Sequence, residues 1–109
     1  MARMVVIYRT PENPAVFDKH YVNVHIPLAR QLTGLIKYEI SKGPVVALAG
    51  AADTYLVGIL YFDSLAAIKE AFASECGRAC AADRRILAPE DKDVQMFLFD
   101  DRDVYSAND

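Results

Sequence analysis

The sequence predicts a single α+β domain with the element order β-α-β-β-α-β. Short apolar segments rich in β-branched residues alternate with segments whose apolar residues recur at helical spacing. Turn-forming residues, chiefly proline and glycine, separate these segments. The chain has 109 residues and contains no internal repeat or linker, so we expect one domain over residues 1–109.

The first strand and helix are expected at the N-terminal end. Residues 4–9, MVVIYR, are apolar and β-branched, as in a strand. A helix is expected to begin at Pro14, with Asn13 as its N-cap. Helical spacing gives this helix an apolar core stripe made of Phe17, Tyr21 and Val24.

Pro27 is expected to interrupt this helix. It has no N–H to donate to residue 23, and its ring disfavours helical geometry at Ile26. The helix should therefore kink, or restart with Pro27 in its first turn and end at Gly34.

Three more strands are expected. Residues 35–43 alternate, with Ile36, Tyr38 and Ile40 on one face and charged residues on the other, which is typical of an edge strand. Residues 55–62 and 94–99 are apolar on both faces, as in covered strands. The loop at 44–54 is too long for a tight hairpin and is expected to cover a pocket mouth or act as a flap.

The remaining helices lie between the last two strands. Asp63 or Ser64 is expected to cap a helix with a core stripe of Leu65, Ile68 and Phe72. A further helical piece should run from about Ser74 to Leu87. Residues 101–109 are expected to form a loose acidic tail.

This order of elements is the ferredoxin-like split βαβ pattern, in which the helices cover one face of a four-stranded antiparallel sheet. Strands 55–62 and 94–99 also have apolar side chains on the face without helices, and an apolar sheet face of that size is unstable in water. We therefore expect two copies to pack face to face as a homodimer.

Composition excludes several classes of partner. The net charge is −3 and the 12 basic residues are scattered, so nucleic acid is not an expected partner. The longest apolar run contains Asp53 and several glycine and proline residues, which argues against a membrane helix. The N-terminal segment lacks the pattern of an export signal, so the expected location is cytoplasmic.

The two cysteines, Cys76 and Cys80, are four residues apart on one expected helix. Two thiolates are too few for a structural zinc site, so no metal is expected. Small buried side chains are the expected role, and a redox pair is the alternative.

Both histidines precede Pro27. On a regular helix the side chains of His20 and His25 would point about 140° apart, so they are not expected to bind one ion. His20 is either a half-buried residue beside the core stripe or part of a cavity wall. His25 either bonds to backbone groups freed by Pro27 or takes part in binding or acid–base catalysis, for which imidazole is well suited near neutral pH.

The motif H-Y-x-x-x-H-x-P-L-A, followed by G-L-x-K-Y-E, resembles the EthD family of the dimeric α/β-barrel superfamily. The resemblance extends over essentially the whole chain and implies a ferredoxin-like fold that pairs into a dimeric barrel. The wider superfamily includes isomerases, cyclases, cofactor-free monooxygenases and heme-binding proteins. In isomerase-like relatives a histidine and a tyrosine matching His25 and Tyr38 lie in the active pocket, but the cysteine of their middle strand is replaced here by an apolar segment.

Two functions follow from this resemblance. The first is a cofactor-independent enzyme in which His25 takes a proton and Tyr38 stabilises the resulting oxyanion on a small apolar carbonyl, lactone or phenolic metabolite. The second is a non-enzymatic accessory that binds such a molecule in an oxidative degradation pathway. The expected substrate-binding residues are His20, Tyr21, Tyr8 and Tyr61.

Overall fold

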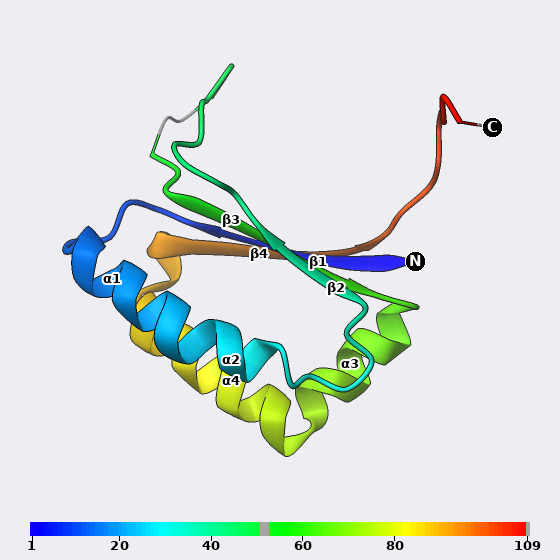
Figure 1. Ribbon diagram of the computed structural model, residues 1–109, viewed down its shortest axis with the longest axis horizontal. Coiled ribbons are helices and arrows are strands. Elements are labelled where there is room, and N and C mark those ends of the chain that lie inside the picture. The colour runs from blue at the N-terminus through cyan, green and yellow to red at the C-terminus, as the bar shows by residue number, and fades with distance from the viewer. Residues whose placement is uncertain (51–52, 109) are drawn as a thin grey trace.

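A four-stranded antiparallel sheet with helices on one face forms the protein (Figure 1). The computed structural model describes residues 1–50 and 53–108. The strands are β1 (Ala2–Tyr8), β2 (Lys37–Ile40), β3 (Leu56–Phe62) and β4 (Val94–Asp100), in the order β2-β3-β1-β4. The predicted ferredoxin-like fold class is confirmed, and β2 lies at an edge of the sheet as expected.

The helices begin where the sequence predicts them. They are α1 (Pro14–His20), η1 (Tyr21–His25), α2 (Ile26–Ala29), α3 (Leu65–Ala73), α4 (Glu75–Leu87) and the 3-10 turn η2 (Asp91–Asp93). Three side chains cap helix N-termini: Asn13 accepts from the Val16 N–H at 3.2 Å, Ser64 from Ala67 at 3.0 Å and Ser74 from Gly77 at 3.1 Å.

The α-helix restarts with Pro27 in its first turn, as one of the two expectations had it, but a π turn joins it to α1 and it ends at Ala29 rather than at Gly34. Residues Tyr21–His25 form a π-helical turn, in which the Ile26 N–H bonds to the Tyr21 carbonyl five residues earlier. The α-helical pattern resumes with the bond from the Arg30 N–H to the Ile26 carbonyl. A π turn is wider than an α turn, so it accommodates one extra residue without ending the helix.

The π turn changes which side chain is buried, so the prediction of Val24 as a core residue was wrong. Val24 is 39% exposed, whereas His25 is only 8% exposed. The buried stripe runs through Phe17, Tyr21, His25 and Ala29, each four residues after the last. The extra residue in the π turn shifts the stripe by one position and carries His25 into the core.

Helices α3 and α4 meet at Gly77. A Cβ at this position would overlap backbone atoms of Ala71 and Phe72, so only glycine permits the observed approach. This contact fixes the start of α4 against α3 and therefore the position of the α4 residues that face the sheet.

The two faces of the sheet differ sharply. Residues facing the helices, such as Ala2, Met4, Val6 and Tyr8 of β1, are buried. The strand register places another set on the helix-free face, among them Val5, Ile7, Val57, Ile59, Phe97 and Phe99. Phe97 and Phe99 are 49% and 43% exposed, so an apolar surface is open on this side.

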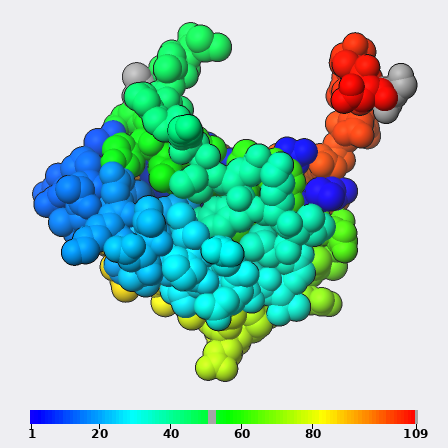
Figure 2. Space-filling view, viewed as in Figure 1, coloured from blue at the N-terminus to red at the C-terminus, as the bar shows by residue number. Residues whose placement is uncertain are grey.

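Two segments stand away from the body of the molecule, one containing residues 43–50 and the other residues 102–108 (Figure 2). In the first, Val46 is 78% exposed and Leu48 is 98% exposed. Its base lines an open hollow of about 490 Å³ that also involves Tyr55. The predicted loop 44–54 includes residues 51–52, and the predicted tail 101–109 includes residue 109, all three of which lie outside the described residues.

The start of the acidic tail is anchored. A carboxylate oxygen of Asp101 lies 3.3 Å from the N-terminal ammonium group, and the other lies 3.3 Å from Nη2 of Arg3. Beyond it, Val104 and Tyr105 are 92% and 84% exposed.

Over the described ranges, no helix is long and apolar enough to cross a membrane.

Candidate functional site

Both histidines bind the same buried carboxylate. Nε2 of His20 lies 2.7 Å from Oδ1 of Asp83, and Nδ1 of His25 lies 2.8 Å from Oδ2. Asp83 on α4 is 6% exposed and His25 is 8% exposed. The expectation that the two rings point about 140° apart is therefore wrong, because the π turn between them brings residues five apart onto one side of the helix.

Asp83 was not among the residues predicted from sequence, although its position carried a signal. Gly77 and Cys80 are also buried on α4 and precede Asp83 at intervals of three residues. An aspartate that continues a buried helical stripe needs a partner, because an unpaired charge in the interior is costly. Here the two imidazoles supply that partner.

The geometry fixes the tautomer of His25. An ionised carboxylate only accepts hydrogen bonds, so Nδ1 of His25 and Nε2 of His20 each donate an N–H to Asp83. In neutral His25 this leaves a lone pair on Nε2. Within the described residues Nε2 makes no hydrogen bond, and no buried side-chain nitrogen or oxygen lacks a partner, so Nε2 is not sealed inside the packed core.

Burial makes His25 a neutral imidazole at neutral pH. Desolvation lowers the pKa of His25 from its ordinary value of 6.5, and this effect outweighs the opposing influence of Asp83. His25 therefore combines a free lone pair on Nε2 with a carboxylate behind Nδ1, which is the arrangement of a general base.

His25 lines a cavity of about 190 Å³ between the helices and the sheet, here called the inner cavity. Most of its wall is apolar and includes Val6, Leu32, Leu60 and Phe72. Its polar side chains are those of His25, Tyr8, Arg84 and Arg85. A cavity of about 150 Å³ accommodates benzene, so the inner cavity is suited to a ligand with a single ring.

Tyr38 lies on the helix side of the sheet but in another cavity. It lines a hollow of about 310 Å³ beside α2, and His25 is absent from that wall. The two residues are joined through Tyr21, whose ring centroid is 5.2 Å from that of His25 and whose hydroxyl bonds to the Tyr38 hydroxyl. His25 and Tyr38 thus belong to one chain of contacts without sharing a cavity.

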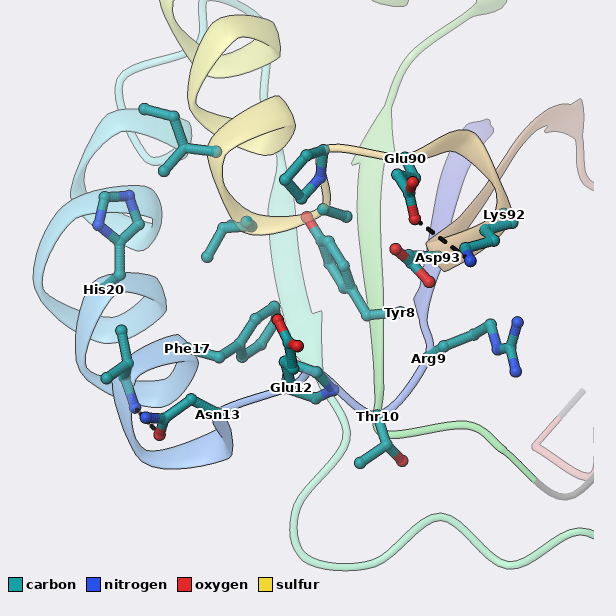
Figure 3. A pocket seen from close by; sticks show the side chains of 16 residues that line it. Tyr8, Arg9, Thr10, Glu12, Asn13, Phe17, His20, Glu90, Lys92 and Asp93 are labelled. Atoms are coloured by element: carbon teal, nitrogen blue, oxygen red, sulfur yellow. Dashed lines mark hydrogen bonds and ion pairs between the residues drawn. The ribbon is translucent and has the colours of Figure 1, made fainter.

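His20 faces a larger and more open hollow than the inner cavity, with a volume of about 640 Å³, here called the outer hollow. In Figure 3, Tyr8 projects between the α1 side, where Phe17 and His20 lie, and the segment with Glu90, Lys92 and Asp93. Tyr8 lines both the inner cavity and the outer hollow. Burial raises the pKa of Tyr8, so its phenol keeps its proton at neutral pH.

Tyr61, the fourth residue predicted to bind substrate, does not line the inner cavity, the outer hollow or the hollow beside α2. Strand alternation places it on the helix-free face, because its neighbours Leu60 and Phe62 face the helices. Its hydroxyl donates to Glu39, and the guanidinium of Arg3 lies 4.6 Å from its ring centroid.

The cysteines are both unpaired thiols. Cys80 is buried and lines the inner cavity, where burial raises its pKa to about 12. The Sγ of Cys76 lies 3.5 Å from the carbonyl oxygen of Leu28.

Among residues 1–50 and 53–108, no group of three or more His, Cys, Asp or Glu side chains has the geometry of a metal site.

These features define a class of protein: a ferredoxin-like α+β domain with a buried histidine–aspartate pair on an apolar cavity. The EthD domain model matches residues 9–88. An uncharacterized 11.0 kDa protein from the thcB-thcC intergenic region of Rhodococcus erythropolis is 37% identical over 84 residues, covering 76% of this chain and 80% of that protein. The chain belongs to the EthD family.

Solved structures agree with this assignment. An ethyl tert-butyl ether degradation (EthD) family protein from Bacillus halodurans has a TM-score of 0.82 at 26% identity, covering 94% of this chain and 99% of that one. SnoaB, a cofactor-independent oxygenase from Streptomyces nogalater, has a TM-score of 0.64 at 16% identity, covering 94% of each chain. A dimeric ferredoxin-like protein of unknown function from Thermobifida fusca has a TM-score of 0.64 at 16% identity, covering 90% and 88%. The last two likenesses show the fold alone.

Proposed function

We propose that this EthD-family protein is a cofactor-independent enzyme that removes a proton from a small, largely apolar carbonyl compound, lactone or phenol. The observation that carries the proposal is the buried His25–Asp83 pair, with Nδ1 of His25 held 2.8 Å from Asp83 and the His25 side chain lining an apolar cavity. A base in an apolar site works on weak carbon or oxygen acids because little water competes for it.

In the proposed reaction, Nε2 of His25 accepts the proton of a C–H or O–H group of the ligand. Asp83 then faces an imidazolium and stabilises it, while the electron pair moves onto the ligand oxygen as an enolate or phenolate. Tyr8 is the phenol that shares the inner cavity with His25, so it is the candidate donor to this oxygen. Tyr38 contributes through its hydrogen bond to Tyr21. Return of the proton to another ligand atom completes an isomerisation.

We propose a reaction without a cofactor because the chain is similar in fold to SnoaB, a cofactor-independent oxygenase. Oxygenation would begin with the same proton removal and would need molecular oxygen to receive the electrons. An isomerase requires nothing beyond the base and the oxyanion donor, so proton removal is the step common to both.

The test is deuterium exchange. The full chain is incubated in deuterated buffer with a panel of single-ring 1,3-diketones and unsaturated lactones, and isotope incorporation is followed by mass spectrometry. A parallel panel of dihydroxyphenols is followed by oxygen uptake. We expect exchange or oxygen uptake with at least one compound, lowered by about 10²-fold or more in His25→Ala. An equal rate in His25→Ala would contradict the proposal.

A second candidate is a non-enzymatic accessory that binds such a ligand. One observation favours it: Tyr38, the expected oxyanion donor, lies in a different hollow from His25. A binder needs no acid–base pair at one point. Saturable binding of a panel compound without isotope exchange or oxygen uptake would support this candidate over the enzyme.

We also propose a homodimer formed through the helix-free face of the sheet. The apolar residues of that face come from β1, β3 and β4, and they include the half-exposed Phe97 and Phe99. Burial of apolar area of this kind favours association. The similarity in fold to a dimeric protein from Thermobifida fusca supports association into a dimer.

A further inference from the structure

We propose that His20 is a positioning residue for His25: by sharing Asp83 with it, His20 holds the carboxylate in place and takes up solvent protons in place of His25. The catalytic meaning of this inference rests on the proposed function, whereas the coupling between the two rings stands on the geometry. Neither the family match nor the comparisons assign a role to His20.

Asp83 connects the two imidazole rings. Asp83 is buried and each of its oxygens accepts from a different imidazole, at 2.7 Å from His20 and 2.8 Å from His25. A carboxylate with only one partner would be free to rotate about its side-chain torsion. The bond from His20 removes that freedom and keeps Oδ2 directed at Nδ1 of His25.

The two rings differ in their exposure to solvent. The side chain of His25 is 10% exposed and that of His20 is 28% exposed. His20 also lines the outer hollow, whereas His25 lines the inner cavity. Water therefore reaches the ring of His20 more readily, and Nδ1 of His20 is the open nitrogen because Nε2 is engaged by Asp83.

The charges of the three groups also couple the two rings. One buried carboxylate balances one imidazolium, and a second positive ring beside it would be an uncompensated buried charge. Proton uptake by His20 therefore opposes proton uptake by His25. In agreement, the proximity of His20 is one of the influences that lower the pKa of His25, after desolvation.

The other charged or titratable groups around His25 do not replace His20 in this role. Tyr21 packs on the His25 ring, and the inner cavity adds Tyr8 from β1 and Cys80, Arg84 and Arg85 from α4. Burial raises the pKa of both tyrosines and that of Cys80, so these groups stay neutral near pH 7. Within the described residues, the hydrogen bonds of Asp83 are those with His20 and His25, so His20 is the neighbour that shares the carboxylate with His25.

The test is an NMR titration of the ring nitrogens of His25 in the ¹⁵N-labelled full chain. His20→Gln keeps an N–H donor for Asp83 but takes up no proton. We expect the pKa of His25 to rise by about 0.5 unit or more in this variant, because an opposing charge is removed. The Nδ1–H tautomer of His25 should persist in His20→Gln and be lost or mixed in His20→Leu, which offers no donor.

Lys19→Gln is the matched control, since it removes a positive charge from the adjacent, exposed position. An equal shift of His25 in the control and in His20→Gln, or no shift in either, would overturn the proposal. The wild-type titration is a second measurement that needs no variant: coupling predicts that the His25 signals respond in two steps, and a single step would contradict it. None of these readouts uses a substrate, so failure of the proposed reaction is distinguishable from failure of the coupling.

Discussion

Replacing Asp83 with asparagine tests the hydrogen bonds at the centre of the site. One carboxylate oxygen becomes an amide NH2 group, while the shape of the side chain is kept. The carboxylate accepts from both His20 and His25. An asparagine side chain has one oxygen that still accepts, but its amide group donates. One ring N–H then meets another N–H, and that ring must either change tautomer or lose its partner.

The expected cost follows from these contacts. A hydrogen bond to a charged group contributes about 1.5–3 kcal/mol, and a buried donor left without a partner costs about 1–3 kcal/mol. With one bond lost and the other weakened, Asp83→Asn should lower the free energy of unfolding by about 2–4 kcal/mol. For a domain of this size, that is a fall in Tm of roughly 10–25 °C.

The assay is urea and thermal unfolding at pH 7.5, with wild type and variant at equal chain concentration because association stabilises the folded state. Asp63→Asn is the matched control, since Asp63 is exposed and should tolerate the change within about 0.5 kcal/mol. If Asp83→Asn were as stable as Asp63→Asn, the two histidine contacts would contribute little and the reasoning about the site would be refuted.

Three other outcomes are expected. The pKa of His25 is lowered in the folded chain, so as pH falls the His25 imidazole takes up its proton first in the unfolded chain. The free energy of unfolding should therefore fall as pH drops below about 6.5. His25→Gln should remove that part of the pH dependence. Gly77→Ala, despite better helix propensity, should destabilise by about 1–3 kcal/mol in urea unfolding, because its Cβ overlaps the α3 backbone; equal or higher stability would contradict this. Sedimentation at micromolar concentration should give twice the 12.1 kDa chain mass, and Phe97→Glu should give monomers; a monomeric wild type would exclude the sheet-face dimer.

The parts of the fold predicted from sequence are those governed by local chemistry. Asn13 and Ser64 cap helices because their side-chain oxygens meet free backbone N–H groups within the same turn. The alternation around Tyr38 predicted an edge strand because strand side chains point to opposite faces in a period of two. Each of these predictions depends on neighbours a few residues apart, and the residues themselves carry that information.

The parts that were missed depend on distant contacts. Helical spacing of 3.6 residues predicted Val24 in the core, but the π turn buries His25 instead. Asp83 lies 58 positions from His25 along the chain, so nothing local pairs them. Strand alternation alone did not indicate which face of the sheet would hold Tyr61, because both faces of that segment are apolar. In each case the packing of α4 and the sheet against the first helix decides the outcome.

Pro27 explains why the π turn occurs where it does. A π turn replaces bonds between residues four apart with bonds between residues five apart, and elsewhere in a helix this replacement loses good hydrogen bonds. At Pro27 the helical bond to residue 23 is impossible in any case, because proline has no N–H. The change of register is therefore least costly just before it, where the Ile26 N–H reaches the Tyr21 carbonyl. The residue gained by this turn is the one that brings His25 onto the same side as His20, so the proline that seems to break the helix is what allows both rings to bind Asp83.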